Sequence, residues 1–281
     1  MNTIDLGKVT EQVNQLCQRA NWDLGDDVVR ALKKALEKEE SPTGRRILEQ
    51  ILENADISRQ RHAPLCQDTG FAVFFVEMGR DLAFKGEGTL QDAIERGVAD
   101  GYTSGFLRKS IVSDPLNRVN TGDNTPAVVH LTQVPGDNLK ITFAAKGGGS
   151  ENMSRLAMLK PADGVQGVKD FVVDAVRRAG ANPCPPVIVG VGIGGTFEKC
   201  AMLAKKSLLR ELGDRHPEPY YAALEEELLE LVNRTGVGPQ GLGGTTTALD
   251  VLVEAHPCHI ASLPVALNMQ CHSARHRSVT L

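Results

Sequence analysis

The sequence predicts a mixed α/β fold, and three observations support this fold class. Apolar residues recur at helical spacing through the first 60 residues. After that point, short apolar runs typical of strands alternate with amphipathic stretches typical of helices. The apolar residues make up 41% of a 281-residue chain, which is enough for a sizeable core. We therefore expect one catalytic domain over residues 1–281, with residues 1–60 as a helical lead-in.

The helical lead-in contains three amphipathic segments. In the first segment Val9, Val13 and Leu16 share one helical face, and in the second Val28 and Leu32 do so. The third segment begins at Ser41-Pro42, where serine is a typical N-cap and proline suits the first helical position.

The later elements follow from the same periodicities. Helices are predicted at residues 89–98, 168–179, 196–210 and 219–234, and strands at residues 71–76, 186–193, 248–253 and 260–267. The apolar segments 127–134 and 139–145 flank the turn sequence Pro-Gly-Asp-Asn, which predicts a hairpin. The order of strands in the sheet does not follow from these patterns.

The composition excludes several classes of protein. Lys and Arg number 31 against 35 Asp and Glu, so the net charge of −4 argues against a broad nucleic-acid surface. No apolar run approaches the 18 residues of a membrane span, and the polar N-terminus lacks the apolar core of a signal peptide. We therefore expect a cytoplasmic protein, in which the six cysteines stay reduced.

Two segments crowd polar groups onto turns. Residues 64–70, PLCQDTG, place Cys66 and Asp68 together, which fits either a metal-binding thiolate beside an acid or base, or a buried cysteine with a turn-capping aspartate. Residues 144–153 contain Lys-Gly-Gly-Gly-Ser, whose exposed backbone N–H groups could form an anion-binding nest or a flexible strand exit.

Two further glycine-rich segments do not match nucleotide-binding motifs. Residues 189–196 lack the Rossmann spacing and a following strand that ends in an acid, so close helix–strand packing explains the glycines better. Residues 235–247, TGVGPQGLGGTTT, lack the Gly-Lys-Ser/Thr ending of a P-loop. Near the C-terminus, the residues Cys258, His259, Cys271 and His272 could form a zinc site, which would make this a structural zinc protein.

Taken together, several motifs resemble the α-subunit, or N-terminal domain, of class I iron–sulfur fumarate hydratases, whose near relatives are the L(+)-tartrate dehydratases. The matching segments are PLCQDTG, FLRKSIV, AAKGGGSENMS, NPCPPVIVGVGIGGT, GVGPQGLGGTTTALDV and LNMQCHSARHR, in this order over residues 64–277.

The resemblance implies a cofactor and a set of site residues. A [4Fe–4S] cluster would be held by Cys66, Cys184 and Cys271, with one iron left without a protein ligand, while Cys17, Cys200 and Cys258 fall outside the ligand motifs. It further implies that Arg108 binds a substrate carboxylate, that Gln67, Asp68 and Gly149 line the substrate site, and that Asp68 and His259 handle protons. We read Cys200 as a residue that packs a helix, on the same side as Leu203 and Ala204.

The resemblance also implies a partner. Single-chain members continue into a second domain, so this chain is expected to need a β-subunit, in an α2β2 assembly, to act on a small dicarboxylate. The expected reaction is the hydration of fumarate to (S)-malate, a step of the tricarboxylic acid cycle, because Lys146–Asn152 and Gly194-Gly195-Thr196 match the fumarate branch. The alternative is an L(+)-tartrate dehydratase α-subunit.

Overall fold

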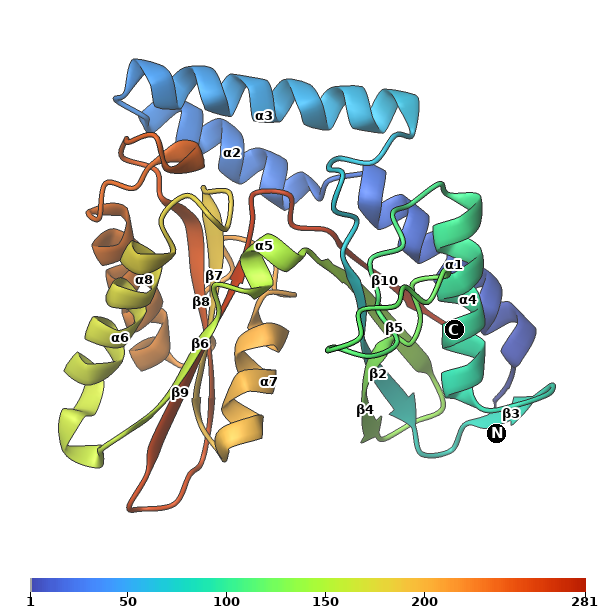
Figure 1. Ribbon diagram of the computed structural model, residues 1–281. Coiled ribbons are helices and arrows are strands. Elements are labelled where there is room, and N and C mark those ends of the chain that lie inside the picture. The colour runs from blue at the N-terminus through green and yellow to red at the C-terminus, as the bar shows by residue number, and fades with distance from the viewer. Residues whose placement is uncertain (1) are drawn as a thin grey trace. The chain divides into compact units, whose positions relative to one another are not determined.

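The computed structural model describes residues 2–281, which form two compact units with one four-stranded sheet each (Figure 1). Unit 1 comprises the described residues up to Leu24, Ala55–Gly148 and Arg275–Leu281, and unit 2 comprises Gly25–Asn54 and Gly149–Ala274. The predicted mixed α/β class and the helical N-terminal segment are confirmed. That residues 1–281 act as a single catalytic domain stays a prediction.

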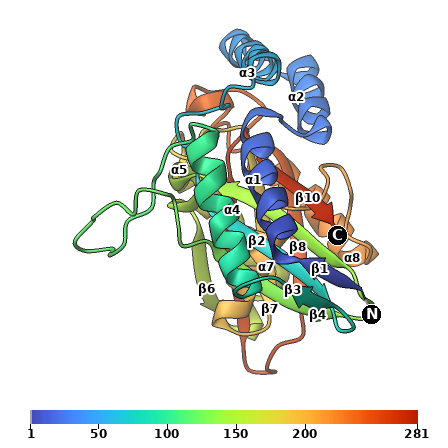
Figure 2. The same cartoon turned by 90° about the vertical axis from the view of Figure 1, so that its right-hand side faces the viewer.

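Unit 1 is a sheet with two helices against one face. Its strands lie in the order β10 (His276–Thr280), β5 (Leu139–Lys146), β2 (Phe71–Gly79) and β4 (Val128–Val134). The helices α1 (Leu6–Trp22) and α4 (Leu90–Ser104) lie side by side over this sheet (Figure 2). A short parallel pair, β1 (Thr3–Asp5) and β3 (Ala83–Lys85), completes the unit.

The predicted hairpin of residues 127–134 and 139–145 is wrong. Both strands form, but β2 lies between them, antiparallel to β5 and parallel to β4. The turn at 135–138 passes over the end of β2, where Gly79 donates its N–H to the carbonyl of Asn138. A Cβ at Gly79 would lie 2.4 Å from the carbonyl oxygen of Gly136, so this crossing requires glycine. The nearly continuous burial of β2 explains its central position.

Unit 2 has helices on both faces of its sheet (Figure 1). The strand order is β6 (Arg155–Leu159), β9 (Leu263–Gln270), β7 (Val187–Gly194) and β8 (Ala248–His256). Helices α6 (Gly164–Ala179) and α8 (Pro219–Asn233) pack on one face, and α7 (Phe197–Ser207) packs on the other. The unit also holds α2 (Asp26–Lys38), α5 (Gly148–Glu151) from Gly149 onward, and the first part of α3 (Pro42–Arg61). Two 3₁₀ turns, η1 (Pro161–Asp163) and η2 (Pro239–Gly241), complete it.

Close packing of α7 on β7 explains Gly190 and Gly192, as the predicted helix–strand packing requires. A Cβ at Gly190 would lie 2.1 Å from the carbonyl oxygen of Ala204, and a Cβ at Gly192 would lie 2.0 Å from that of Cys200. Cys200 on α7 is fully buried in a cluster with Ala204 of the same helix and Ala266 of β9, which confirms its role in helix packing.

Helix starts also match the local sequence signals. Helix α3 begins at Pro42, and the hydroxyl of Ser41 accepts the N–H of Gly44 at 3.2 Å. Thr89 and Asp92 form a capping box at the start of α4.

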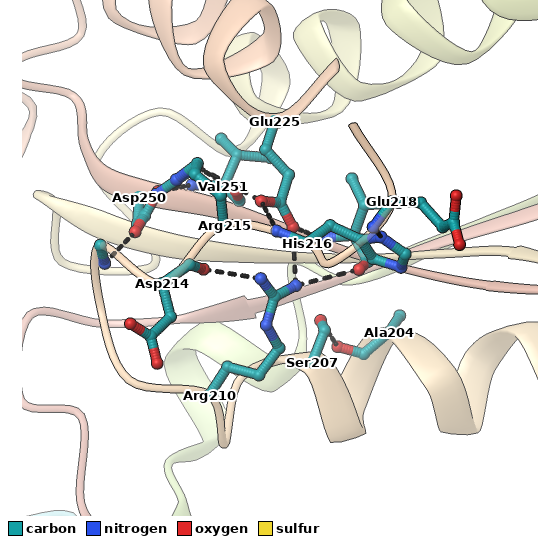
Figure 3. A network of polar contacts seen from close by, with 12 residues as sticks. Ala204, Ser207, Arg210, Asp214, Arg215, His216, Glu218, Glu225, Asp250 and Val251 are labelled. Atoms are coloured by element: carbon teal, nitrogen blue, oxygen red, sulfur yellow. Dashed lines mark hydrogen bonds and ion pairs between the residues drawn. The ribbon is translucent and has the colours of Figure 1, made fainter. Parts of the chain in front are cut away.

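A buried polar network fixes the connector between α7 and α8 onto β8 (Figure 3). The carboxylate of Glu225 on α8 is fully buried and pairs with Arg210 at 2.7 Å and with Arg215 at 3.5 Å. It also accepts the backbone N–H of Val253 at 2.8 Å and of His216 at 2.9 Å.

No helix of the described residues has the length and apolar character that a membrane span requires.

Candidate functional site

The turn that carries Cys66, Gln67 and Asp68 joins α3 to β2 in unit 1. The carboxylate of Asp68 accepts the N–H of Gly70 at 3.0 Å through Oδ1 and the N–H of Gly148 at 2.7 Å through Oδ2. Gly70 has φ of +82°, and a Cβ there would lie 2.8 Å from the backbone nitrogen of Lys146, so the turn can approach β5 only with glycine. The carboxylate is thus held in one orientation by two backbone donors.

Unit 1 also brings Arg108 to this turn. The hydroxyl of Thr69 accepts the N–H of Arg108 at 2.9 Å and donates to the carbonyl of Arg108 at 3.2 Å. The buried side chain of Asn124 adds a second link, because it accepts the N–H of Ser110 and donates to the carbonyl of Gly70. Arg108 itself is exposed. Cys66, Gln67, Asp68 and Arg108 therefore belong to one local structure, although about 40 residues of chain separate them.

A buried arginine that sequence reasoning did not assign supports the same turn. Arg275 is 3% exposed, and its Nη1 donates to the backbone carbonyl of Asp68 at 2.6 Å and to the side chain of Asn21 at 3.0 Å. Its Nε is buried without a hydrogen-bond partner among the described residues. The only sequence signal for this role is its place in the motif SARHR after Cys271.

In unit 2 the sheet register brings Cys184 and Cys271 together. Strands β7 and β9 are antiparallel, and Ile188 pairs with Gln270. Cys184 lies four residues before Ile188, and Cys271 directly follows Gln270, so both cysteines lie at the same end of the sheet. The Nδ1 of His272 lies 3.0 Å from the carbonyl oxygen of Cys184, which confirms that the two turns are in contact.

The turn of Cys184 has an unusual backbone and a close neighbour. Cys184 is exposed and has φ of +55°, a conformation that non-glycine residues seldom adopt outside functional or tightly constrained sites. Gly149 lies beside this turn, because a Cβ at that position would lie 3.2 Å from the carbonyl oxygen of Asn182.

The structure does not bring His259 to the same end of the sheet. His259 is exposed on the connector between β8 and β9, whereas Cys271 follows β9 at its other end. An extended strand of that length spans about 25 Å. The same separation rules out the zinc site predicted from Cys258, His259, Cys271 and His272, because two of these residues precede β9 and two follow it. Among residues 2–281 no group of three or more His, Cys, Asp or Glu side chains is arranged to hold a metal ion.

The accessibility of Cys66, Cys184 and Cys271 is compatible with the predicted iron–sulfur ligands, and this ligand set stays a prediction. Clusters bind thiolates, which must be accessible and deprotonated. Cys17 and Cys200 are fully buried, and burial raises the pKa of both thiols. Cys66 and Cys271 are half-buried, Cys184 is exposed, and none of the six cysteines within the described residues forms a disulfide.

Comparisons with known proteins place the chain in a family. The family model described as fumarate hydratase (Fumerase) matches residues 10–280. A Methanocaldococcus jannaschii protein, provisionally named L(+)-tartrate dehydratase subunit alpha, is 41% identical over 273 residues, which cover 95% of each chain. L(+)-tartrate dehydratase subunit alpha is 36% identical in Escherichia coli UTI89 and 35% identical in Escherichia coli K12, in each case over 98% of this chain and 91% of the relative.

The fold and the comparisons together define a hydro-lyase, an enzyme that adds or removes water. More particularly, the chain belongs to the fumarate hydratase (Fumerase) family.

Proposed function

We propose that this chain is the α-subunit of an iron–sulfur hydro-lyase that acts on a four-carbon dicarboxylate. The observation that carries the proposal is the sorting of the cysteines: the three in the family motifs are accessible, whereas Cys17 and Cys200 are buried. Cys258 is exposed, but it lies on the β8–β9 connector, at the other end of β9 from Cys271.

The proposed ligands are Cys66, Cys184 and Cys271. When bound, a [4Fe–4S] cluster with one iron free of protein ligands supplies a Lewis acid for a departing hydroxyl group. The chain's own residues then have to bind the carboxylates, orient the carbon skeleton and accept the proton from the neighbouring carbon.

Arg108 and Asp68 are the proposed binding and proton-handling residues. The planar guanidinium of Arg108 can donate two parallel hydrogen bonds to one carboxylate. Each oxygen of Asp68 accepts one backbone N–H and keeps a further lone pair, so Oδ1 or Oδ2 can take up the carbon-bound proton. The proton and the hydroxyl group together leave as water, and the reverse sequence hydrates the double bond. We propose that Gln67 and Gly149 line the substrate beside them.

The proton-handling role of His259 stays a prediction, and the structure limits where this residue can act. Because β9 separates it from Cys271 of its own chain, His259 can serve this chemistry only at a centre that another chain presents to it. A His259→Ala variant that keeps full activity would remove it from the proposal.

For the substrate, we propose L(+)-tartrate, which would lose water to give oxaloacetate. The names of the relatives at 35% to 41% identity support this choice over fumarate. Fumarate remains the second candidate because the family model is that of fumarate hydratase and because Lys146–Asn152 and Gly194-Gly195-Thr196 match the fumarate branch.

A substrate panel distinguishes the two candidates. The chain is reconstituted anaerobically together with the proposed β-subunit, and kcat/KM is measured for L(+)-tartrate and for fumarate. We expect tartrate to be preferred by at least tenfold, about 1.4 kcal/mol. A preference for fumarate would overturn the tartrate assignment, and activity on neither would overturn both substrate assignments.

The partner is proposed to be a β-subunit that supplies the remaining substrate-binding groups, in an α2β2 assembly. The subunit names of the relatives support this proposal. The cluster-loaded chain alone should be inactive and should gain activity when the β-subunit is added. Full activity of the chain alone would refute the shared site. We also propose a cytoplasmic location, where reduced thiols remain available as ligands.

A further inference from the structure

The glycine-rich loop of residues 236–247 is used by none of the steps above, yet it contacts the turn of Cys184. The backbone N–H of Gln240 donates to the carbonyl of Pro185 at 2.8 Å, and its side-chain Nε2 donates to the same oxygen at 2.8 Å. Pro185 directly follows Cys184, so two donors from one residue fix the backbone beside this thiol.

The backbone of the loop is shaped for this approach. Gln240 has φ of +52°, which costs free energy for a residue with a side chain. A Cβ at Gly241 would lie 2.4 Å from the Cβ of Ala181, which begins the turn of Cys184. The loop therefore packs against this turn as closely as its backbone allows.

The same glutamine reaches the turn of Cys271. Its Nε2 lies 3.3 Å from the Nδ1 of His272, and that nitrogen lies 3.0 Å from the carbonyl of Cys184. A carbonyl oxygen can only accept, so the 3.0 Å contact is a hydrogen bond when Nδ1 of His272 carries the proton, and the amide of Gln240 then packs against His272 without a second hydrogen bond. Gln240 thus fixes the carbonyl beside Cys184 by hydrogen bonds and lies against His272, whose own hydrogen bond joins the turns of Cys184 and Cys271.

We propose that Gln240 is a positioning residue that holds the turns of Cys184 and Cys271 at a fixed spacing for the cluster. This inference rests on the proposed function, because it assigns both cysteines as ligands. Groups that orient metal ligands act in this way, and their loss commonly lowers metal affinity by about 10- to 100-fold. The proposal gives the glycine-rich loop a role: it carries Gln240 to the ligand turns.

Two variants of different character test the proposal. Gln240→Leu keeps the bulk and removes the amide. Gln240→Gly removes the amide and also relieves the positive φ, so it should fold even if the leucine variant does not. The matched control is Gln50→Leu, since Gln50 on α3 lines the same pocket of about 400 Å³ as Gln240 and His272.

The readouts do not depend on turnover. Each full-length chain is reconstituted anaerobically, its iron is counted, and the first-order loss of the cluster's visible absorbance in air is followed. The electron paramagnetic resonance spectrum of the reduced cluster reports the ligand geometry, and circular dichroism of the apo chain reports folding. We expect both Gln240 variants to lose the cluster about tenfold faster and to show an altered spectrum, while Gln50→Leu behaves as the unmodified chain.

Two results would overturn the inference in distinguishable ways. Equal rates of cluster loss and identical spectra in all four chains would show that Gln240 does not position the turns of Cys184 and Cys271. An unmodified chain that takes up no more iron than a Cys184→Ser variant would instead refute the proposed function, and the inference would fail with it.

Discussion

Replacement of Glu225 by alanine tests the physical account of unit 2 most sharply. The carboxylate is fully buried, accepts hydrogen bonds from Arg210 and from the N–H groups of Val253 and His216, and forms an ion pair with Arg215 at 3.5 Å (Figure 3). Removal of one partner from a buried ion pair costs about 3–5 kcal/mol. Because Arg210 and Arg215 are 19% and 24% exposed, water can solvate them in part, and the lower end of about 3 kcal/mol applies.

Glu226→Ala is the matched control for this prediction. Glu226 is exposed on the same helix, so its replacement changes the same residue type without touching the network and should alter stability by less than about 0.5 kcal/mol. In thermal unfolding followed by circular dichroism, Glu225→Ala should lower Tm by about 6–12 °C. If the two variants unfolded at the same temperature, the network would not stabilise the unit and the reasoning would be refuted.

Three further predictions concern the site and its supports. Arg108→Lys keeps the charge but loses the planar fork, so kcat/KM should fall at least tenfold, about 1.4 kcal/mol; unchanged kinetics with full cluster content would remove Arg108 from the site. Burial opposes ionisation of Glu39, but hydrogen bonds from the N–H groups of Thr245, Ser41 and Thr246 outweigh burial and lower its pKa. The free energy of unfolding, measured by urea titration, should therefore decline as the pH falls below about 4.3. Glu39→Gln should flatten that decline, and an equal decline in both proteins would show that the carboxylate contributes nothing. Gly192→Ala should cost about 1–3 kcal/mol, because its Cβ would lie 2.0 Å from the carbonyl of Cys200; an unchanged Tm would contradict the packing of α7 on β7.

Local sequence signals predicted every α-helix and strand of more than five residues, but neither the shorter ones nor how the strands pair. The Pro-Gly-Asp-Asn turn at 135–138 correctly indicated that the chain reverses there. It carried no information on which strand would lie beside β5, because β2 comes from about 60 residues earlier and takes the central position by its apolar character. The strand β10 was missed because its sequence, HRSVT, has little apolar periodicity.

The site was predictable where a motif names residues and not where support comes from elsewhere in the chain. Cys66 and Asp68 stand in one motif, and their turn forms as expected. Arg275 and Gln240 act through backbone carbonyls, which leave no pattern in the sequence. The role of His259 stays a prediction, and the structure adds that β9 separates this residue from Cys271 of the same chain. The choice of fumarate rested on two short motifs, and the names of the relatives favour tartrate instead.

The central claim is that three particular thiols hold the cluster, and iron analysis of six single Cys→Ser variants tests it directly. Each full-length variant is reconstituted anaerobically, checked for folding by circular dichroism, and analysed for iron and sulfide. We expect about four irons per chain in the unmodified protein and in the variants at Cys17, Cys200 and Cys258. We expect the variants at Cys66, Cys184 and Cys271 to lose the cluster. Retention of the cluster in any of these three, or its loss from the Cys258 variant, would contradict the assignment.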